Sequence, residues 1–400
     1  MRVLLISPVA GLDPAGGDLT YTQMLASNPP DGVEYETYDQ AISRGALMEH
    51  GTRQSLKNAW RSKKGVLREF LFTVIAKSVN LLKKRRVLFW EPFRFFSVRA
   101  GEYDLVHMHI FSARFLQLDC PLVVSCGGPL RYLYIDARDY STKRARRLEK
   151  IDLFLARLLK VNDYSGYLPQ ASYFYTFTRS GTKEFQKRRI IDPARIGYVP
   201  FYMPSLPSTS TPPNSEYSQE SRQPKRVGFV ARDFNKKGGF TVLEAWKTVR
   251  SQRPDAELVI AGSPVPKDVE KYGEGITWLP YLPREELLNS LMPSFDVFVY
   301  PTLYDYLPCY TLVEVMARGI PIAGNDHRDY EEFLGDKSGL VAPKNDASAL
   351  ARNILELLEP HNNEVYRRGA REHFEKNYSA DVVLPQVGAC YRAAMEARQA

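Results

Sequence analysis

The chain has 400 residues and a net charge of +8, with 44% hydrophobic and 25% charged residues. This length suits two domains, and the composition excludes a disordered or fibrous protein. Four cysteines without a C-x-x-C pair exclude a disulfide scaffold and a zinc-finger pattern, so we expect reduced thiols in a cytosolic protein. No apolar run is long enough for a membrane-spanning helix, and the apolar start is too short for a secretory signal.

The first half of the chain alternates candidate strands and helices. Short apolar or β-branched segments that end near Gly, Ser or Pro are the expected strands, at 3–7, 105–109, 122–126 and 173–177. A helix over 141–160 is among the helical segments between them. Such alternation predicts a parallel sheet covered on both faces. We therefore expect an N-terminal Rossmann-like domain over 1–205.

The second half repeats this organisation after a linker. Pro, Ser, Thr and Gln dominate 206–225, where no apolar period is present. Strands are then expected at 226–232, 257–261, 276–279, 297–300 and 320–323, and helices at 239–250, 284–292, 311–318 and 347–358. This pattern predicts a second doubly wound domain over 226–379. The last helix, at about 380–400, is expected to cross back onto the first domain.

The loop after the strand at 226–232 carries two basic residues. Arg232 and Lys237 stand five residues apart around a loop that opens a helix. Ligands of α/β proteins bind at the carboxyl ends of parallel strands, and the N-terminus of a helix favours an anion. Both side chains can therefore converge on a diphosphate there. The alternative is a solvated basic turn.

The loop after the strand at 297–300 carries acidic groups. Asp305 lies in the loop itself, and Glu314 lies in the otherwise apolar helix that follows. A carboxylate on an apolar helix face needs a partner. A sugar hydroxyl is one possible partner, and a neighbouring Arg or a helix dipole is another.

These motifs, in this order, resemble the retaining glycosyltransferases of family GT4. The resemblance consists of the Arg-x4-Lys-Gly loop, the sequence IAG at 260–262, YPT at 300–302 and EVMARGIP at 314–321. It is strong over 226–345 and weaker in the first half, where the Gly-Gly pair at 16–17 and VHMH at 106–109 are similar to family motifs. It implies an α/β, GT-B fold: two facing Rossmann-like domains with parallel sheets and an inter-domain cleft, with a nucleotide-sugar donor bound mainly to the second.

The resemblance assigns donor-binding roles in the second domain. Arg232 and Lys237 would hold the diphosphate and stabilise the leaving group. Glu314 would accept hydrogen bonds from the ribose hydroxyls. The N–H groups of Tyr310 and Thr311, at a helix start, would face the phosphates.

The resemblance also assigns roles in the first domain, where the sequence departs from the family pattern. Gly17 would let the backbone approach the donor or acceptor, and His109 would lie beside the transferred sugar. The family usually has an acid eight residues before the helix Glu, a position that Tyr306 occupies here. Either the loop has one extra residue and Asp305 serves, or Tyr306 replaces the acid; we expect the first. Gly127 stands where the family often has a His, and this departure concerns binding of the acceptor more than binding of the donor.

The charge distribution singles out one segment. Residues 53–99 hold 13 basic and two acidic side chains, a net +11, so the rest of the chain sums to −3. Aromatic residues alternate with the charges, which is typical of a monotopic segment on an anionic membrane surface. Two alternatives are aromatic packing inside the first domain with solvated charges, and nucleic-acid binding. Nucleic-acid binding is less expected because the aromatic residues cluster as LFW and FRFF, whereas proteins that bind nucleic acids usually present them singly.

Taken with the resemblance, these features imply a metal-independent hexosyltransferase whose domain over 1–205 faces the acceptor and the membrane. No Asp-x-Asp strand end and no His/Asp/Glu cluster with metal spacing occurs, so we expect no metal and no other cofactor. The enzyme would move a sugar, with retention, from a nucleotide-sugar to a lipid-linked or cell-surface glycan acceptor, as a cytoplasmic protein peripheral to the inner membrane face. The alternatives are an epimerase or phosphorylase of similar fold, a nucleic-acid-binding protein or DNA-modifying GT-B transferase, and a catalytically silent GT4-like sugar-binding protein.

Overall fold

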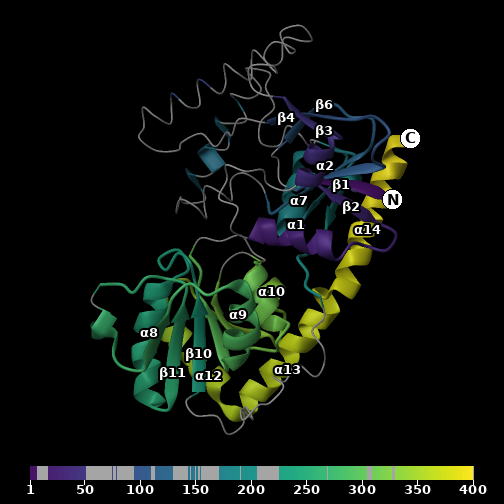
Figure 1. Cartoon of the computed structure of the whole chain (residues 1–400). Coiled ribbons are helices and arrows are strands. Elements are labelled where there is room, and N and C mark those ends of the chain that lie inside the picture. The colour runs from purple at the N-terminus through teal and green to yellow at the C-terminus, as the bar shows by residue number, and fades with distance from the viewer. Residues whose placement is uncertain are drawn as a thin grey trace. The chain divides into compact units, whose positions relative to one another are not determined.

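The chain forms two compact units in the computed structural model (Figure 1). The first unit comprises Met1–Pro200 and Leu384–Ala400, and the second comprises Phe201–Val383. The structure describes residues 1–6, 17–50, 94–109, 113–128, 171–189, 191–204, 225–267, 269–303, 309–326 and 329–399, with a few helical positions between 74 and 154.

The first unit is built on a six-stranded parallel sheet of order β2-β1-β5-β7-β8-β9. Its strands are β1 (Arg2–Ile6), β2 (Glu34–Thr37), β5 (Leu105–His109), β7 (Leu122–Cys126), β8 (Tyr173–Thr176) and β9 (Ile196–Tyr198). Helices α1 (Gly17–Ser27), α2 (Tyr38–Arg44) and α7 (Arg179–Arg188) belong to the same unit. Every residue of β5 and β7 is buried, as the continuous apolar runs of a doubly covered strand require.

A small second sheet in the first unit has the order β3-β4-β6. Its strands are β3 (Leu47–His50), β4 (Arg94–Val98) and β6 (Ala113–Gln117); β3 and β4 are antiparallel, and β4 and β6 parallel. Phe96 of β4 is fully buried in the core of the unit, with its ring centroid 5.8 Å from that of Tyr38. The packing interpretation of the basic segment therefore holds at Phe96, and most of 53–93 lies outside the described residues.

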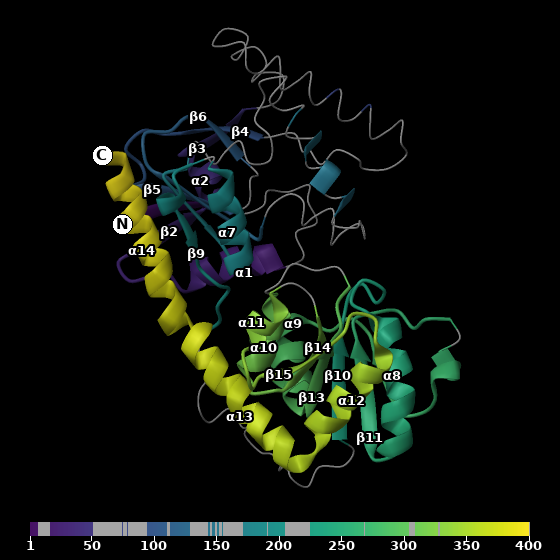
Figure 2. The same cartoon turned by 180° about the vertical axis from the view of Figure 1, so that it is seen from behind.

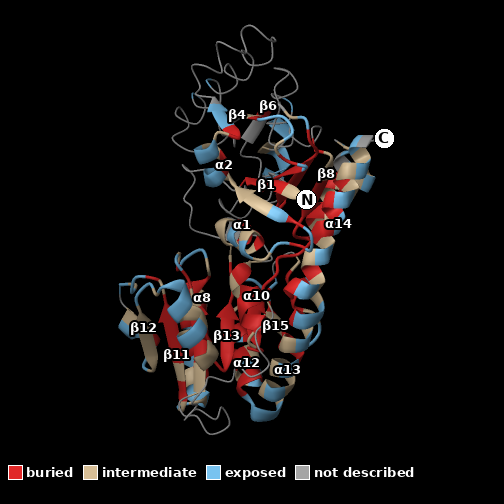
Figure 3. Cartoon of the chain, turned by 45° about the vertical axis from the view of Figure 1, so that its right-hand side comes forward, coloured by how far each residue is buried: buried red, intermediate tan, exposed pale blue. Residues whose placement is uncertain are grey.

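The second unit has a six-stranded parallel sheet of order β12-β11-β10-β13-β14-β15. Its strands are β10 (Lys225–Val230), β11 (Ala256–Ala261), β12 (Ile276–Leu279), β13 (Val297–Tyr300), β14 (Ile322–Asn325) and β15 (Gly339–Ala342). The strand order reverses between β10 and β13, and doubly wound sheets bind ligands at the carboxyl edge of such a switch point. Buried residues concentrate in the four central strands, β10, β11, β13 and β14 (Figure 3).

The helices of the second unit include two that follow the central strands. These two are α8 (Gly239–Gln252), after β10, and α10 (Tyr310–Met316), after β13; the unit also contains α9 (Arg284–Glu286), α11 (Tyr330–Leu334), α12 (Ala347–Leu358) and α13 (Pro360–Asn377). The predicted helix at 284–292 is α-helical only at its start and continues as a π-helix (Leu287–Leu291) and a 3-10 turn (Met292–Ser294). Pro293 lacks the N–H that a continuous α-helix needs.

The C-terminal helix α14 (Ala380–Gln399) begins in the second unit, and its residues from Leu384 belong to the first. In the first unit it lies beside β2 (Figure 2), and the hydroxyls of Tyr391 and Tyr35 are 2.5 Å apart. The predicted α/β class with two parallel-sheet Rossmann-like units is confirmed. The helix predicted at 141–160 lies largely outside the described residues, and the cleft predicted between the units stays a prediction.

Candidate functional site

Two loops interlock at the carboxyl edge of the second sheet, at its switch point. The N–H of Leu303, after β13, donates to the carbonyl of Lys236, after β10, at 2.8 Å. Gly238 has a φ of +78°, and a Cβ built there would collide with the carbonyl oxygen of Pro301. A glycine is therefore required for this close approach, and the interlock fixes the loop that carries Lys237.

Lys237 is bound to the last residue of β13. Its ammonium donates to the Tyr300 hydroxyl at 2.6 Å and lies 4.9 Å from the centroid of the same ring. The Cys309 thiol also donates to that hydroxyl, at 3.2 Å, and Cys309 is the N-cap of α10. Burial lowers the pKa of Lys237 and raises that of Tyr300. The cluster joins the β10 loop, the end of β13 and the start of α10.

Arg232 begins the same loop, and its side chain is exposed. The loop then turns at Asp233, whose carboxylate accepts from the Lys236 N–H at 3.1 Å and pairs with the Lys236 ammonium at 3.1 Å. The sequence therefore places one exposed guanidinium and one half-buried ammonium on a structured loop at the ligand-binding edge.

Glu314 is buried on α10, with 2% of its surface exposed, among apolar neighbours. Its carboxylate forms an ion pair with the guanidinium of Arg284, the first residue of α9. Of the partners considered from the sequence, the structure thus shows the neighbouring Arg. Burial raises the pKa of Glu314, and Arg284 acts in the opposite direction.

Arg318 fixes the backbone around Glu314. It follows the C-terminal end of α10, four residues after Glu314, and donates to the Glu314 carbonyl at 2.9 Å and to the Leu288 carbonyl at 2.8 Å. Burial lowers the pKa of Arg318. Glu314 therefore lies on backbone that the Arg318 hydrogen bonds anchor. Its carboxylate pairs with Arg284, whose side chain is 47% exposed.

The start of α10 lies close to the predicted position. The helix begins at Tyr310, and the Cys309 carbonyl accepts from the N–H groups of Leu312 at 3.2 Å and Val313 at 3.4 Å. The Tyr310 ring packs on Phe201, with 4.6 Å between the centroids. The N–H groups of Tyr310 and Thr311 are thus in the first turn of a helix that follows the carboxyl end of β13.

His109 lies at the carboxyl end of β5 in the first unit, with no exposed surface. Its Nδ1 is 2.9 Å from the Ser125 hydroxyl of β7, which is also 2.9 Å from Nε2 of His107. Nδ1 of His107 in turn contacts the Tyr391 hydroxyl of α14 at 2.7 Å. The sequence singled out His109 and missed the other three. The available signal was the alternation of 107 and 109, which places both on one face of a strand.

Three expected site residues lie at the edge of the described residues or outside them. Gly17 is the first residue of α1, and the rest of the Gly-rich loop, 7–16, lies outside the described residues. Asp305 and Tyr306 also lie outside them, so the one-residue offset between them stays a prediction.

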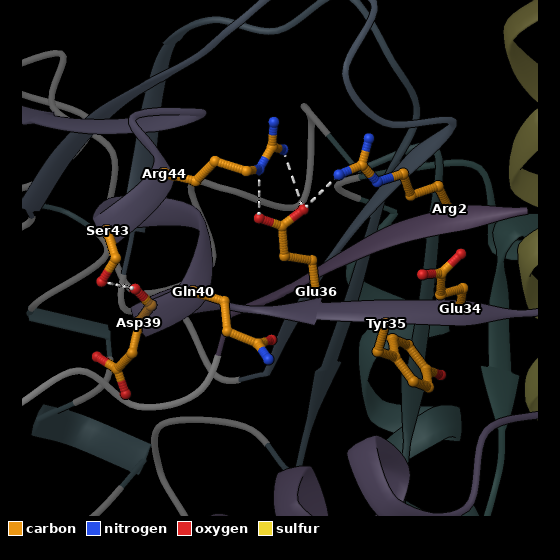
Figure 4. A pocket seen from close by; sticks show the side chains of 8 residues that line it. All are labelled: Arg2, Glu34, Tyr35, Glu36, Asp39, Gln40, Ser43 and Arg44. Carbon is orange, nitrogen blue, oxygen red and sulfur yellow. Dashed lines mark hydrogen bonds and ion pairs between the residues drawn. The ribbon is translucent and has the colours of Figure 1, made fainter.

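The first unit has a hollow of about 710 Å³ that none of the predicted site residues lines (Figure 4). Its floor is an ion-pair network in which Glu36 binds Arg2 at 2.8 Å and Arg44 at 2.9 Å. The bond from Arg44 is the main cause that lowers the pKa of Glu36. Arg2 and Arg44 also pair with Glu102, so both arginines that line the hollow are already engaged in ion pairs.

In the described part of the chain, no group of three or more His, Cys, Asp or Glu side chains is placed to hold a metal ion. Within the same residues, no helix combines the length and hydropathy needed to cross a membrane.

Part of the second unit matches a family of known proteins. Residues 224–360 match the family model described as Glycosyl transferases group 1. A phosphatidyl-myo-inositol mannosyltransferase of Propionibacterium freudenreichii is 32% identical over 173 residues, which are 42% of this chain and 43% of that protein. The chain thus matches less than half the length of this relative.

Solved structures extend the likeness to both units. Sucrose-phosphate synthase of Thermosynechococcus elongatus has a TM-score of 0.61 at 18% identity, covering 99% of this chain and 100% of that one. Alr3699/HepE of Anabaena, in complex with UDP, has a TM-score of 0.61 at 12% identity, covering 98% and 100%. The GT-B fold is confirmed, and the resemblance to GT4-type glycosyltransferases is confirmed over the matched residues.

Proposed function

We propose that this protein is a retaining glycosyltransferase that moves a sugar from a nucleotide-sugar donor to a lipid-linked or cell-surface glycan acceptor. The observation that carries the proposal is the interlocked pair of loops at the β10–β13 switch point. They bring Lys237 to the start of α10, the helix that bears Glu314. All of these residues lie within the segment that matches the Glycosyl transferases group 1 model.

Lys237 and Arg232 are proposed to bind the donor diphosphate and to stabilise the nucleotide that leaves. The bond to the neutral Tyr300 phenol holds the Lys237 ammonium beside the start of α10 without neutralising its charge. A half-buried cation is worth more to a phosphate than one in bulk water, because the local dielectric is lower. The first-turn N–H groups of Tyr310 and Thr311 add the dipole of a helix N-terminus.

Glu314 is proposed to accept hydrogen bonds from the donor ribose. A carboxylate has two oxygens and about four lone-pair sites, so the ion pair with Arg284 leaves capacity for a diol. Burial in an apolar helix face makes an unsatisfied carboxylate costly, which favours occupation by hydroxyl donors. The UDP complex of the structurally similar Alr3699/HepE supports a nucleotide ligand for this fold.

Chemistry at the sugar is proposed to proceed without a metal or other cofactor. Asp305 and His109 would lie beside the transferred sugar, and Gly17 would allow the backbone to approach the donor or acceptor. The acceptor hydroxyl would attack the face from which the diphosphate leaves, and the leaving phosphate oxygen would take its proton. Lys237, Arg232 and the α10 N-terminus would offset the charge that develops on that oxygen.

The acceptor side is proposed to face a membrane from the cytoplasm. The named activity of the Propionibacterium relative, on a phosphatidyl-myo-inositol, supports a lipid-linked acceptor. The net charge of +11 over 53–99 supports attraction to anionic lipid, at about 1 kcal/mol for each basic residue near the surface. The alternative is that this basic segment binds nucleic acid, which a comparison of binding to anionic vesicles and to duplex DNA would decide.

A thermal-shift screen of UDP-, GDP- and ADP-sugars tests the donor assignment. A ligand at 100 times its Kd stabilises the folded state by about 2.7 kcal/mol. The matching donor should raise the Tm of the wild type and of Lys236→Ala, whose side chain faces Asp233, but not that of Lys237→Ala. With that same donor, the wild type should also transfer the sugar or hydrolyse the nucleotide-sugar. A wild type that responds to no nucleotide-sugar, or a Lys237→Ala variant that responds like the wild type, contradicts the proposal.

A further inference from the structure

A continuous chain of hydrogen bonds, buried from Tyr391 onward, crosses the first unit and reaches His109. It starts at the Tyr35 hydroxyl on β2, 2.5 Å from the Tyr391 hydroxyl on α14. Tyr391 contacts Nδ1 of His107 at 2.7 Å, and Nε2 of His107 contacts the Ser125 hydroxyl at 2.9 Å. Ser125 then contacts Nδ1 of His109 at 2.9 Å. The chain therefore links an edge strand and the C-terminal helix to the end of β5.

The surroundings of this chain hold the two imidazoles in place. His107, Ser125, His109 and Tyr391 have no exposed surface. The Tyr21 ring lies 4.8 Å from the ring of His109, measured between centroids.

Further tyrosines complete the network. The Tyr175 hydroxyl of β8 lies 3.2 Å from Nε2 of His107 and is hydrogen-bonded to the hydroxyl of Tyr21. Buried polar groups are costly unless each finds a partner, so a network of this size constrains every ring in it.

Ser125 is the junction at which the two histidines meet. A serine hydroxyl has one proton, which it donates to one imidazole nitrogen while it accepts from the other. If His107 donates from Nε2, Ser125 donates to Nδ1 of His109, and the His109 proton is on Nε2. If His109 instead donates from Nδ1 to Ser125, then Ser125 donates to Nε2 of His107, and Nδ1 of His107 donates to the Tyr391 hydroxyl. The two tautomers are therefore coupled through one hydroxyl.

We propose that Ser125 is a positioning residue that fixes the ring orientation and the tautomer of His109 and couples both to Tyr391 of the C-terminal helix. His107 takes part as a neutral ring, since burial lowers its pKa well below the ordinary value. The tautomer of a histidine is set by the hydrogen bond at its other nitrogen, and it decides what the ring offers a ligand. The consequence for sugar transfer rests on the proposed function, whereas the coupling itself does not.

The coupling is tested directly by NMR of the full chain with ¹⁵N-labelled histidine rings. The chain has six histidines, and His109→Gln identifies the signals of this one. In Ser125→Ala the His109 ring nitrogens should shift toward a mixture of tautomers, and Ser125→Thr, which keeps the hydroxyl, should restore the wild-type signals. Tyr391→Phe should shift His107 and, through Ser125, His109. Unchanged His109 signals in a folded Ser125→Ala protein would overturn the proposal.

The catalytic consequence is measured separately. Ser125→Ala should lower kcat by roughly tenfold or more, because a mispositioned histidine loses its role in the transition state, with donor KM nearly unchanged. Ser172→Ala, which removes a hydroxyl bonded to the Leu122 N–H of the same sheet, is the matched control and should keep wild-type kcat. Equal kcat in the two alanine variants would overturn the role in transfer. If the wild type transfers no sugar at all, the proposed function fails and the NMR result still decides the coupling.

Discussion

The Lys237 ammonium is 2.6 Å from the Tyr300 hydroxyl, so the loop after β10 is bound through a side chain to the last residue of β13. These two strands are neighbours in the sheet, although β11 and β12 separate them in sequence. The pair therefore spans the switch point, where a ligand of a doubly wound fold is expected.

Tyr300→Phe should weaken donor binding but not abolish it. The variant removes the hydroxyl that accepts from Lys237, so the ammonium loses its fixed position while its charge remains. We expect the donor KM to rise about fivefold, the equivalent of roughly 1 kcal/mol for one hydrogen bond. Tyr330→Phe is the control, since it removes a buried hydroxyl that donates to the Tyr300 carbonyl, 3.3 Å away, and does not touch the ammonium. Equal donor KM values in the two variants would show that Tyr300 does not position Lys237.

Gly238→Ala should destabilise the second unit. Its φ of +78° is costly for alanine, and the new methyl group would meet the Pro301 carbonyl oxygen. We expect a loss of about 2–4 kcal/mol in the free energy of unfolding, measured by urea denaturation. Gly273→Ala is a matched control, because its φ is +96° but no atom lies within 4 Å of the new Cβ. It should lose only about 1 kcal/mol, the backbone cost alone. Similar losses in both variants would argue against the interlock of the two loops.

The stability of the second unit should depend on the ionisation of Glu314. Burial raises the pKa of this carboxyl, so the folded chain binds the proton more tightly than the unfolded chain does. The free energy of unfolding therefore falls as the pH rises from the unfolded pKa through the folded one. Arg284 opposes this effect, so Arg284→Ala should raise the pKa further and steepen the loss between about pH 5 and pH 8.

Urea denaturation at both pH values measures this slope. In Arg284→Ala/Glu314→Gln the additional slope should disappear, because a neutral amide does not titrate. A slope that persists in the double variant would assign it to another group.

The sequence predicted the sheet strands best where they are short apolar runs, both in the buried centre of a sheet and, for Ile276–Leu279, at the edge of the second sheet. Leu105–His109, Leu122–Cys126, Ile276–Leu279 and Val297–Tyr300 have the predicted bounds. The strand Glu34–Thr37 was missed because it lies at the sheet edge and carries two glutamates in four residues. An edge strand does not need the continuous apolar run that identifies a central one.

The candidate site could be predicted only as far as local motifs define it. The loop from Arg232 to Gly239 and the helix bearing Glu314 were recognisable because strand, loop and helix are contiguous. The partners of these residues were not, because Arg284 and Tyr300 reach them through tertiary contacts. For the same reason Ser125 and Tyr391 were missed, since they meet His107 only when β7 and α14 pack beside β5.

Asp305→Asn should impair transfer more than Tyr306→Phe. The resemblance places an acid eight residues before Glu314, and Asp305 reaches that role only if the loop has one extra residue. Loss of the carboxylate should then reduce kcat by roughly 100-fold or more, as for an electrostatic group at the reacting centre. Tyr306→Phe should stay within a few-fold of the wild type. A larger loss in Tyr306→Phe would place the tyrosine at the sugar.

Reversal of four basic residues to Glu, at Lys83, Lys84, Arg85 and Arg86, should release the protein from anionic vesicles. The attraction is electrostatic and screened over about 8 Å at physiological ionic strength, so wild-type binding in liposome flotation should weaken with added salt. Donor binding should be unchanged, because the proposed donor site is built from residues 232–318. Turnover on a soluble acceptor analogue should therefore survive, while turnover on a membrane-embedded acceptor falls. A wild type that never floats with anionic vesicles, or a reversed variant that still floats, would contradict the membrane proposal. Duplex-DNA binding at the same salt concentration would then be the next measurement.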